Sequence, residues 1–131
     1  MFESAELGHT IDRETFKKEV PKLRAALLDV QYDMLEKKDF PVVILISGVD
    51  GSGKGETINL LYSWMDPRHI STLAFSAPSD EERSRPYMWR YWRALPPQGK
   101  IGIFAGSWFS QPNADRIVGN MRRSEMDDRL D

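Results

Sequence analysis

The chain has 131 residues, of which 40% are hydrophobic and 29% are charged, which is enough apolar material for one globular domain. The formal net charge of −2 indicates no general attraction to nucleic acid or to an anionic membrane, so we expect neither as a partner. Cysteine is absent, which excludes disulfides, thiolate metal sites and cysteine nucleophiles. The residues after Met1 do not resemble a signal peptide, and the longest apolar run, at 42–46, is too short to span a bilayer. We therefore expect a cytoplasmic protein.

Residues 1–40 predict an N-terminal helical extension. Asp12 can cap a first turn, and beyond Pro21 apolar residues recur at helical spacing. These residues are Leu23, Leu27, Val30 and Met34. Because such an apolar stripe has to pack on another surface, we expect it to promote self-association. The lysines of this segment predict a solvated face or, alternatively, phosphate contacts; they are Lys17, Lys18, Lys22, Lys37 and Lys38.

The most specific motif is the glycine-rich segment Gly48–Gly55, between the apolar run 42–47 and a helical pattern that starts at Glu56. A strand, a glycine loop and a helix in this order predict a phosphate-binding loop, in which backbone N–H groups, a lysine and the positive end of the helix meet an anion. The predicted phosphate-binding residues are Gly48, Gly51, Ser52, Gly53, Lys54 and Gly55. The alternative is a plain glycine turn.

One position of this loop departs from the usual pattern. Gly55 stands where a serine or threonine normally places a hydroxyl on Mg²⁺. The nearest carboxylate is Asp50, inside the loop. We therefore take Asp50 as the candidate metal ligand, and Asp50 and Lys54 as the candidate catalytic residues.

The rest of the chain continues the alternation of helix and strand. A helix with apolar residues Ile58, Leu61 and Met65 is expected to end at Asp66, a short extended piece follows at 71–76, and Ser79 or Asp80 can cap the next helix. A proline-glycine turn then leads into a second buried strand at 100–104. This order predicts an α/β doubly wound domain over residues 41–131, which binds ligands at the carboxyl ends of its strands.

Arginines and aromatic residues gather between the two expected strands. Guanidinium groups suit phosphate oxygens, so Arg83, Arg90 and Arg93 are candidate nucleotide or polyphosphate contacts; ordinary pairing with nearby carboxylates is the alternative. Tryptophans on apolar helix faces predict core or interface positions more often than base stacking. The two histidines, His9 and His69, have no partner at a catalytic spacing and are interpreted as structural.

Four segments together resemble the polyphosphate kinase 2 family, in the family's order and spacing: Gly48–Thr57, Trp64–Arg68, Pro78–Arg83 and Trp89–Gly99. The opening, residues 1–9, further resembles the two-domain members, in which two related kinase domains are fused. The resemblance implies a P-loop kinase-like three-layer sandwich. It also implies phosphoryl transfer between inorganic polyphosphate and a nucleotide such as AMP or ADP, with Mg²⁺, and packing against a second kinase domain.

The sequence departs from this family after the second strand. Active members carry Asp-Arg-Ser-Trp-Tyr there, whereas this chain reads Ala105-Gly106-Ser107-Trp108-Phe109. The resemblance implies that a metal-binding carboxylate and a transition-state arginine are missing, so the Mg²⁺ site is weak or absent. We therefore expect a degenerate N-terminal half that binds phosphate and catalyses poorly.

The expected strands are too few for a complete doubly wound sheet, so we also expect the domain to be incomplete at its C-terminus. Two other functions remain open: a non-catalytic scaffold and a nucleotide-binding regulatory module, each packing on a catalytic domain. The Ala105-Gly106 pair favours these readings, and the intact loop favours retained ligand binding.

Overall fold

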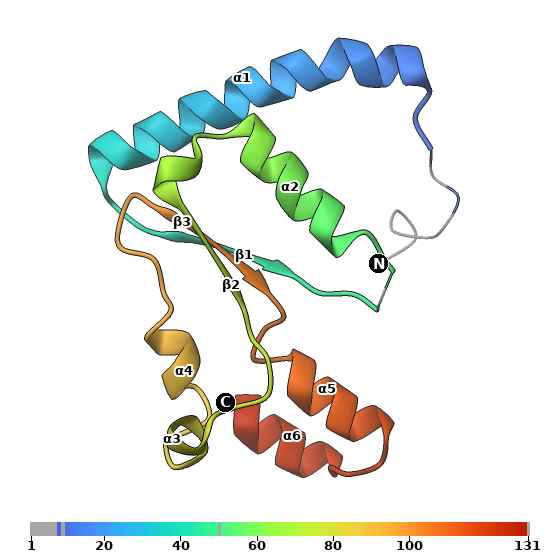
Figure 1. Cartoon of the computed structure of the whole chain (residues 1–131), viewed down its shortest axis with the longest axis vertical. Helices are drawn as coiled ribbons and strands as arrows, with labels where there is room; N and C mark the ends of the chain where they lie inside the picture. The colour runs from blue at the N-terminus through green and yellow to red at the C-terminus, as the bar shows by residue number, and fades with distance from the viewer. Residues whose placement is uncertain (1–7, 9, 50, 131) are drawn as a thin grey trace.

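The computed structural model describes residues 8, 10–49 and 51–130, except for the side chains of residues 129 and 130. Its centre is a sheet of three parallel strands in the order β1-β3-β2 (Figure 1). β1 spans Val42–Ile46, β2 spans Ile70–Ala74 and β3 spans Ile101–Ala105. The predicted α/β fold with a parallel sheet is therefore confirmed.

One face of the sheet is covered by α1 (Arg13–Lys37) and α2 (Lys54–Trp64). Ile103 of the central strand is fully buried there, together with Ile101 and Met65. Half-buried side chains from both helices and from the two edge strands, β1 and β2, complete this core: Leu27, Met34, Val42, Ile44, Ile46, Ile58, Leu61, Tyr62 and Ile70. The alternation of strand side chains then sends Phe104 to the opposite face.

The opposite face carries short helices and an aromatic cluster. Phe104 is fully buried, its ring centre lies 5.0 Å from that of Phe75, and Phe75 lies 4.6 Å from Tyr91 of α4 (Trp89–Trp92). α3 (Asp80–Arg83) precedes α4 and begins with a capping box between Ser79 and Glu82, so the predicted Ser79 cap is confirmed. After β3 the chain forms α5 (Ser110–Ile117) and α6 (Arg123–Leu130), which pack on each other.

The N-terminal segment forms one continuous helix within the range 1–40 that the sequence predicts as helical. Asp12 caps it as expected, but the helix runs unbroken through Pro21 and ends at Lys37, with Lys38 in the left-handed conformation. The predicted apolar stripe is divided: Leu27 and Met34 pack on the core, whereas Leu23 and Val30 are exposed. No helix among the described residues is both long enough and apolar enough to cross a membrane.

The two edge strands, β1 and β2, are less buried than the sequence predicts. β3 is buried along most of its length, because it has a strand on each side. β1 is only half-buried, and most of β2 is exposed. Within the described residues each of these two strands pairs with β3 alone, and neither edge has a further strand.

Candidate functional site

The glycine-rich loop lies between the carboxyl end of β1 and the start of α2, as the sequence predicts. Gly53 caps α2 in the left-handed conformation, with φ of 85°, so the helix begins at Lys54, two residues earlier than expected. Gly51 also has a positive φ, of 78°. Both positions favour glycine because a side chain would strain the backbone there. The loop therefore places the positive end of α2 beside the end of the sheet.

Lys54 is held against its own loop. Its Nζ donates hydrogen bonds to the backbone oxygens of Gly48, at 2.7 Å, and Val49, at 2.8 Å. Gly48 itself lies close to Ser52, since a Cβ atom at Gly48 would clash with the Ser52 Oγ. These contacts draw the two ends of the loop together. Asp50, the candidate metal ligand, lies outside the described residues.

The departure from the family pattern lies directly beside this loop. Ala105 ends β3, and the N–H of Gly106 donates to the carbonyl of Ile46, the last residue of β1, at 3.0 Å. Gly106 has a φ of 84°. The next residue, Ser107, is buried, and its Oγ accepts a hydrogen bond from the N–H of Phe109. Ala105 and Gly106 therefore lie where side chains could face a ligand on the loop, and they offer neither a carboxylate nor a guanidinium.

A metal site here would need ligand groups near the loop and Ala105. Among the described residues, no three histidine, cysteine, aspartate or glutamate side chains come together in a group that could hold a metal ion. Mg²⁺ is usually held by one or two carboxylates together with water and phosphate oxygens, and neither Ala105 nor Gly106 supplies a carboxylate for the ion that the family resemblance implies. No step of a mechanism can be derived through such an ion here.

A cavity of about 470 Å³ opens at the carboxyl ends of β2 and β3. Its walls combine aromatic, hydroxyl and guanidinium groups, among them Phe75, Arg83, Tyr87, Arg90, Tyr91 and Ser110. A mostly apolar cavity with a few convergent polar groups, at this end of a parallel sheet, is the usual form of a small-molecule site.

Two of the three predicted arginines line this cavity. Arg90 is largely buried: it donates to the carbonyl of Ser76 at 3.0 Å, and its Nε lies 3.4 Å from a carboxylate oxygen of Glu82. Arg83 pairs with Asp80 on the rim. Arg93 lies elsewhere, with its guanidinium carbon 4.6 Å from the centre of the Trp89 ring. The structure thus brings Arg83 and Arg90 to one cavity and leaves Arg93 on a neighbouring surface.

Several cavity residues were not singled out from the sequence. Tyr87 donates to the carbonyl of Trp108 at 2.6 Å, and Tyr91 donates to the carbonyl of Ser107 at 3.4 Å. Phe75 forms part of the wall because it directly follows β2. The signal that could have found Phe75 and Ser107 is their position just past the carboxyl ends of two parallel strands.

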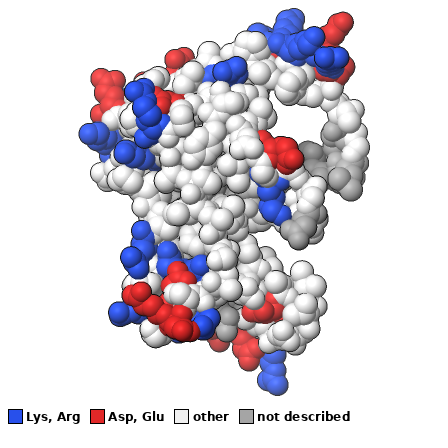
Figure 2. All heavy atoms as spheres, viewed as in Figure 1, with Lys and Arg blue, Asp and Glu red and all other residues white. Residues whose placement is uncertain are grey.

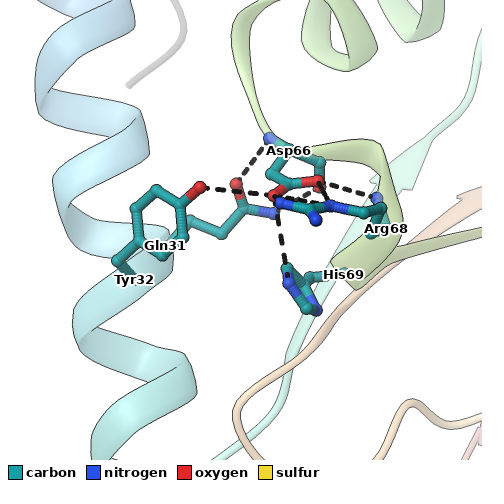
Figure 3. A network of polar contacts seen from close by, with 5 residues as sticks. All are labelled: Gln31, Tyr32, Asp66, Arg68 and His69. Carbon is teal, nitrogen blue, oxygen red and sulfur yellow. Dashed lines mark hydrogen bonds and ion pairs between the residues drawn. The ribbon is translucent and has the colours of Figure 1, made fainter.

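A separate polar network joins α1 to the turn after α2 (Figure 3). The buried amide of Gln31 makes two hydrogen bonds with the backbone of Asp66, at 2.9 and 2.7 Å. The Asp66 carboxylate accepts hydrogen bonds from the Arg68 guanidinium and from Tyr32, while His69 Nε2 lies 3.9 Å away. The bonds from Arg68 hold the pKa of Asp66 far below its usual range.

This network lies at the amino ends of the strands, whereas the loop lies at their carboxyl ends. β2 begins at Ile70, directly after the network, and the amino ends of parallel strands all lie on the same side of the sheet. The Asp66 network therefore fastens α1 to the sheet rather than contributing to the site. The sequence indicates Asp66 as the end of a helix and as part of the family-like segment Trp64–Arg68, but it does not predict this network.

Comparison with known proteins places these features in a family. The model of the polyphosphate kinase 2 family matches residues 10–131. A polyphosphate:AMP phosphotransferase of Pseudomonas aeruginosa is 51% identical over all of this chain, and one of Pseudomonas syringae pv. tomato is 47% identical over 97% of it. The chain spans 26% of the length of each of these two relatives.

Solved structures agree in fold. A crystal structure assigned to polyphosphate kinase 2 from P. aeruginosa superimposes with a TM-score of 0.90 at 51% identity, covering 99% of this chain and 28% of that one. Polyphosphate kinase 2 from Arthrobacter aurescens gives a TM-score of 0.83 at 25% identity, covering 94% of this chain and 45% of that one. The three parallel strands and their helices therefore form part of a larger kinase fold in these relatives.

Proposed function

Because this chain belongs to the polyphosphate kinase 2 family, we propose that it is a domain of a polyphosphate-dependent nucleotide phosphotransferase, binding phosphate at Gly48–Gly55 and catalysing poorly. The observation that supports the proposal is the juxtaposition of a closed glycine loop with Ala105 and Gly106, joined through the Gly106 to Ile46 hydrogen bond. The glycine loop keeps the groups that can bind an anion. Ala105 and Gly106 lack the charged groups that phosphoryl transfer requires. The relatives named above suggest polyphosphate and AMP as the substrates of the whole protein.

Binding would use the backbone N–H groups of the loop, the positive end of α2 and Lys54. The Lys54 Nζ would leave the Gly48 and Val49 carbonyls, or share its protons with them, to reach a phosphate oxygen. Asp50 is proposed to position the acceptor phosphate or a metal ion. Mg²⁺, where bound, would neutralise charge on the phosphates; among the described residues no three candidate ligand side chains gather in one group.

A nucleotide is proposed for the 470 Å³ cavity. Its aromatic wall of Phe75 and Tyr91 offers apolar surface for a base, and Arg83 and Arg90 offer charge for a phosphate. The same cavity supports a second candidate function, a nucleotide-binding regulatory module, because binding there needs none of the groups missing at Ala105 and Gly106. A purely structural scaffold would bind neither ligand.

Calorimetric titration with short-chain polyphosphate tests the loop. Lys54→Ala should weaken binding roughly tenfold or more, since it removes a charged hydrogen-bond donor. Lys100→Ala is the matched control, because Lys100 is exposed at the amino end of β3, away from the loop. Equal affinities for wild type and Lys54→Ala at one salt concentration would show that the loop is not the site.

The catalytic part of the proposal needs its own measurement, which is ADP formation from AMP and polyphosphate. We expect the purified chain to turn over at least about 10³-fold more slowly than complete family members, because stabilisation of the transferred phosphoryl group is lost. The Lys54→Ala variant controls for a contaminating kinase. Robust turnover that depends on Lys54 would contradict the proposal of a degenerate half.

A further inference from the structure

Trp89 of α4 carries two arginines on its ring. The guanidinium carbon of Arg93 lies 4.6 Å from the centre of the ring, and that of Arg85 lies 5.5 Å from it. Both distances are short enough for a cation–π contact. Trp89 is half-buried, whereas both arginines are exposed. These three residues, which we call the arginine–tryptophan stack, therefore hold two positive charges close together at the surface.

The charge of the stack is not neutralised by neighbouring carboxylates. Within the described parts of the chain, the guanidinium groups of Arg85 and Arg93 form no ion pair and no hydrogen bond. The nearby carboxylates of Asp80 and Glu82 are each paired with another arginine. Figure 2 shows basic and acidic atoms mixed over α3 and α4, which agrees with this pairing. Two like charges on one ring repel each other, so an anion that contacts both would be stabilised.

The stack borders a hollow of about 330 Å³ beside the carboxyl end of β2. Trp89 and Arg93 line it, together with Leu73 of β2 and the largely buried Arg90. The Nε atom of Arg90 is buried and has no hydrogen-bond acceptor among the described residues; a Glu82 oxygen 3.4 Å away forms only an ion pair with it. The hollow thus combines apolar surface with guanidinium groups, one of which has an unused donor.

The hollow adjoins the 470 Å³ cavity proposed for the nucleotide. Phe75, Glu82 and Arg90 line both spaces. Arg85 of the stack belongs to the wall of the larger cavity, and Arg93 belongs to the wall of the hollow. The stack therefore extends from one space to the other, so a ligand that contacts both arginines has to be elongated.

We propose that the arginine–tryptophan stack is a second phosphate-binding site, which takes a linear polyphosphate through neighbouring phosphate groups. The planar guanidinium group suits phosphate oxygens because it can donate two parallel hydrogen bonds. Contact with the Trp89 ring restricts both arginines before the ligand arrives, which lowers the entropy cost of binding. The site is distinct from the glycine loop, because β1 and β2 form opposite edges of the described sheet.

The geometry of the stack favours polyphosphate over other polyanions. Both guanidinium groups contact one ring, so the anionic groups that they bind must also lie close together. Consecutive phosphates in polyphosphate share one oxygen, whereas a sugar separates those of a nucleic acid, and the net charge of −2 gives no general attraction to nucleic acid. The inference rests on the proposed function only for the choice of ligand, since the stack exists independently of the loop.

Calorimetric titration with tripolyphosphate at one moderate salt concentration tests the site. Arg85→Gln with Arg93→Gln, which we call the arginine variant, should lose one binding event per chain. Arg13→Gln with Lys17→Gln is the matched control, because it removes the same charge at the start of α1, at the far end of the molecule (Figure 1). Unchanged binding in the arginine variant, or an equal loss in the control, would overturn the proposal.

Lys54→Ala separates this site from the glycine loop. If both sites exist, Lys54→Ala weakens one binding event and leaves the other, and the arginine variant does the converse. A loss in the arginine variant alone would support the stack and contradict the loop. A loss in Lys54→Ala alone would support the loop and contradict the stack.

The role of the ring and the class of ligand need two further measurements. Trp89→Leu should weaken binding at the stack several-fold, whereas Trp92→Leu should not, because the 58% exposed Trp92 on the same helix carries no arginine among the described residues. Equal affinities in the two folded variants would contradict the stacked geometry. Single-stranded DNA and AMP, at equal phosphate concentration, should not displace tripolyphosphate from Lys54→Ala. Displacement by either would overturn the assignment to polyphosphate.

Discussion

Asp66 shows how one side chain determines the join between a helix and a sheet. Its backbone pairs with the buried amide of Gln31, and its carboxylate accepts hydrogen bonds from Arg68 and Tyr32. Only 8% of Asp66 is exposed, so loss of these donors would leave a nearly buried carboxylate without partners. The polar contacts of this residue are therefore coupled to the packing of α1.

The pH dependence of stability should reveal this coupling. The pKa of Asp66 is lower in the folded chain than in the unfolded chain, so its carboxylate stabilises the fold above about pH 4, and this contribution falls as the pH drops further. Asp66→Asn should lower the free energy of unfolding at pH 7 and flatten its decline between pH 5 and pH 3. Arg68→Gln should act similarly, because Arg68 is the main cause of the shift. Denaturant titrations giving parallel pH curves for wild type and both variants would exclude this role.

Gly99 is a second position where one residue has a large effect. It has a φ of 78°, and a Cβ atom there would come within 2.7 Å of the carbonyl oxygen of Met34, near the end of α1. Gly99→Ala should cost about 2 kcal/mol or more of unfolding free energy, from backbone strain and the close contact together. Gly119→Ala is the control, since Gly119 has the same φ but no neighbouring atom within 4 Å. Equal losses in the two variants would show that the contact with Met34 adds nothing.

The Ala105-Gly106 pair leads to a prediction about restored chemistry. Ala105→Asp with Gly106→Arg should recover Mg²⁺ binding, measured by calorimetry in the presence of polyphosphate, before it recovers ADP formation. The expected metal ligand is the new carboxylate, so Ala105→Asn with Gly106→Arg is the control. At a φ of 84°, an arginine at position 106 costs about 1–2 kcal/mol in backbone strain, so each variant also needs a stability measurement. If the metal affinity of a folded Ala105→Asp variant is unchanged, position 105 is not part of a metal site.

At the scale of elements, the sequence predicted the parts that local chemistry determines. The capping side chains of Asp12 and Ser79 lie where expected, and the central strand matches its predicted range to within one residue. The phosphate loop was located because glycine spacing, an apolar run before it and a helical pattern after it are all contiguous in the sequence. Whether its residues bind phosphate stays a prediction.

Features that depend on tertiary contacts were not predictable in the same way. The path of α1 through Pro21 and the division of its apolar stripe follow from packing on α2 and the sheet, which periodicity alone does not contain. The cavity was also missed as a unit, because its walls come from segments after β2, around α4 and after β3. β1 and β2 are exposed because they are the edge strands of the described sheet. The order of strands in a sheet cannot be predicted from a local sequence pattern, so this exposure could not be predicted either.

At the scale of the whole molecule, the order β1-β3-β2 also determines when the sheet can form. β1 and β2 are neighbours in the chain but not in the sheet, and in the part of the chain that the structure describes both pair only with β3, from Ile101 to Ala105. During synthesis at roughly 5–20 residues per second, β2 is complete at Ala74 about 2 to 6 s before β3 is. For that interval neither β1 nor β2 has the strand that it pairs with in the described part of the fold, so the sheet cannot form until β3 has been made, and two unpaired strand edges stay open to wrong pairing.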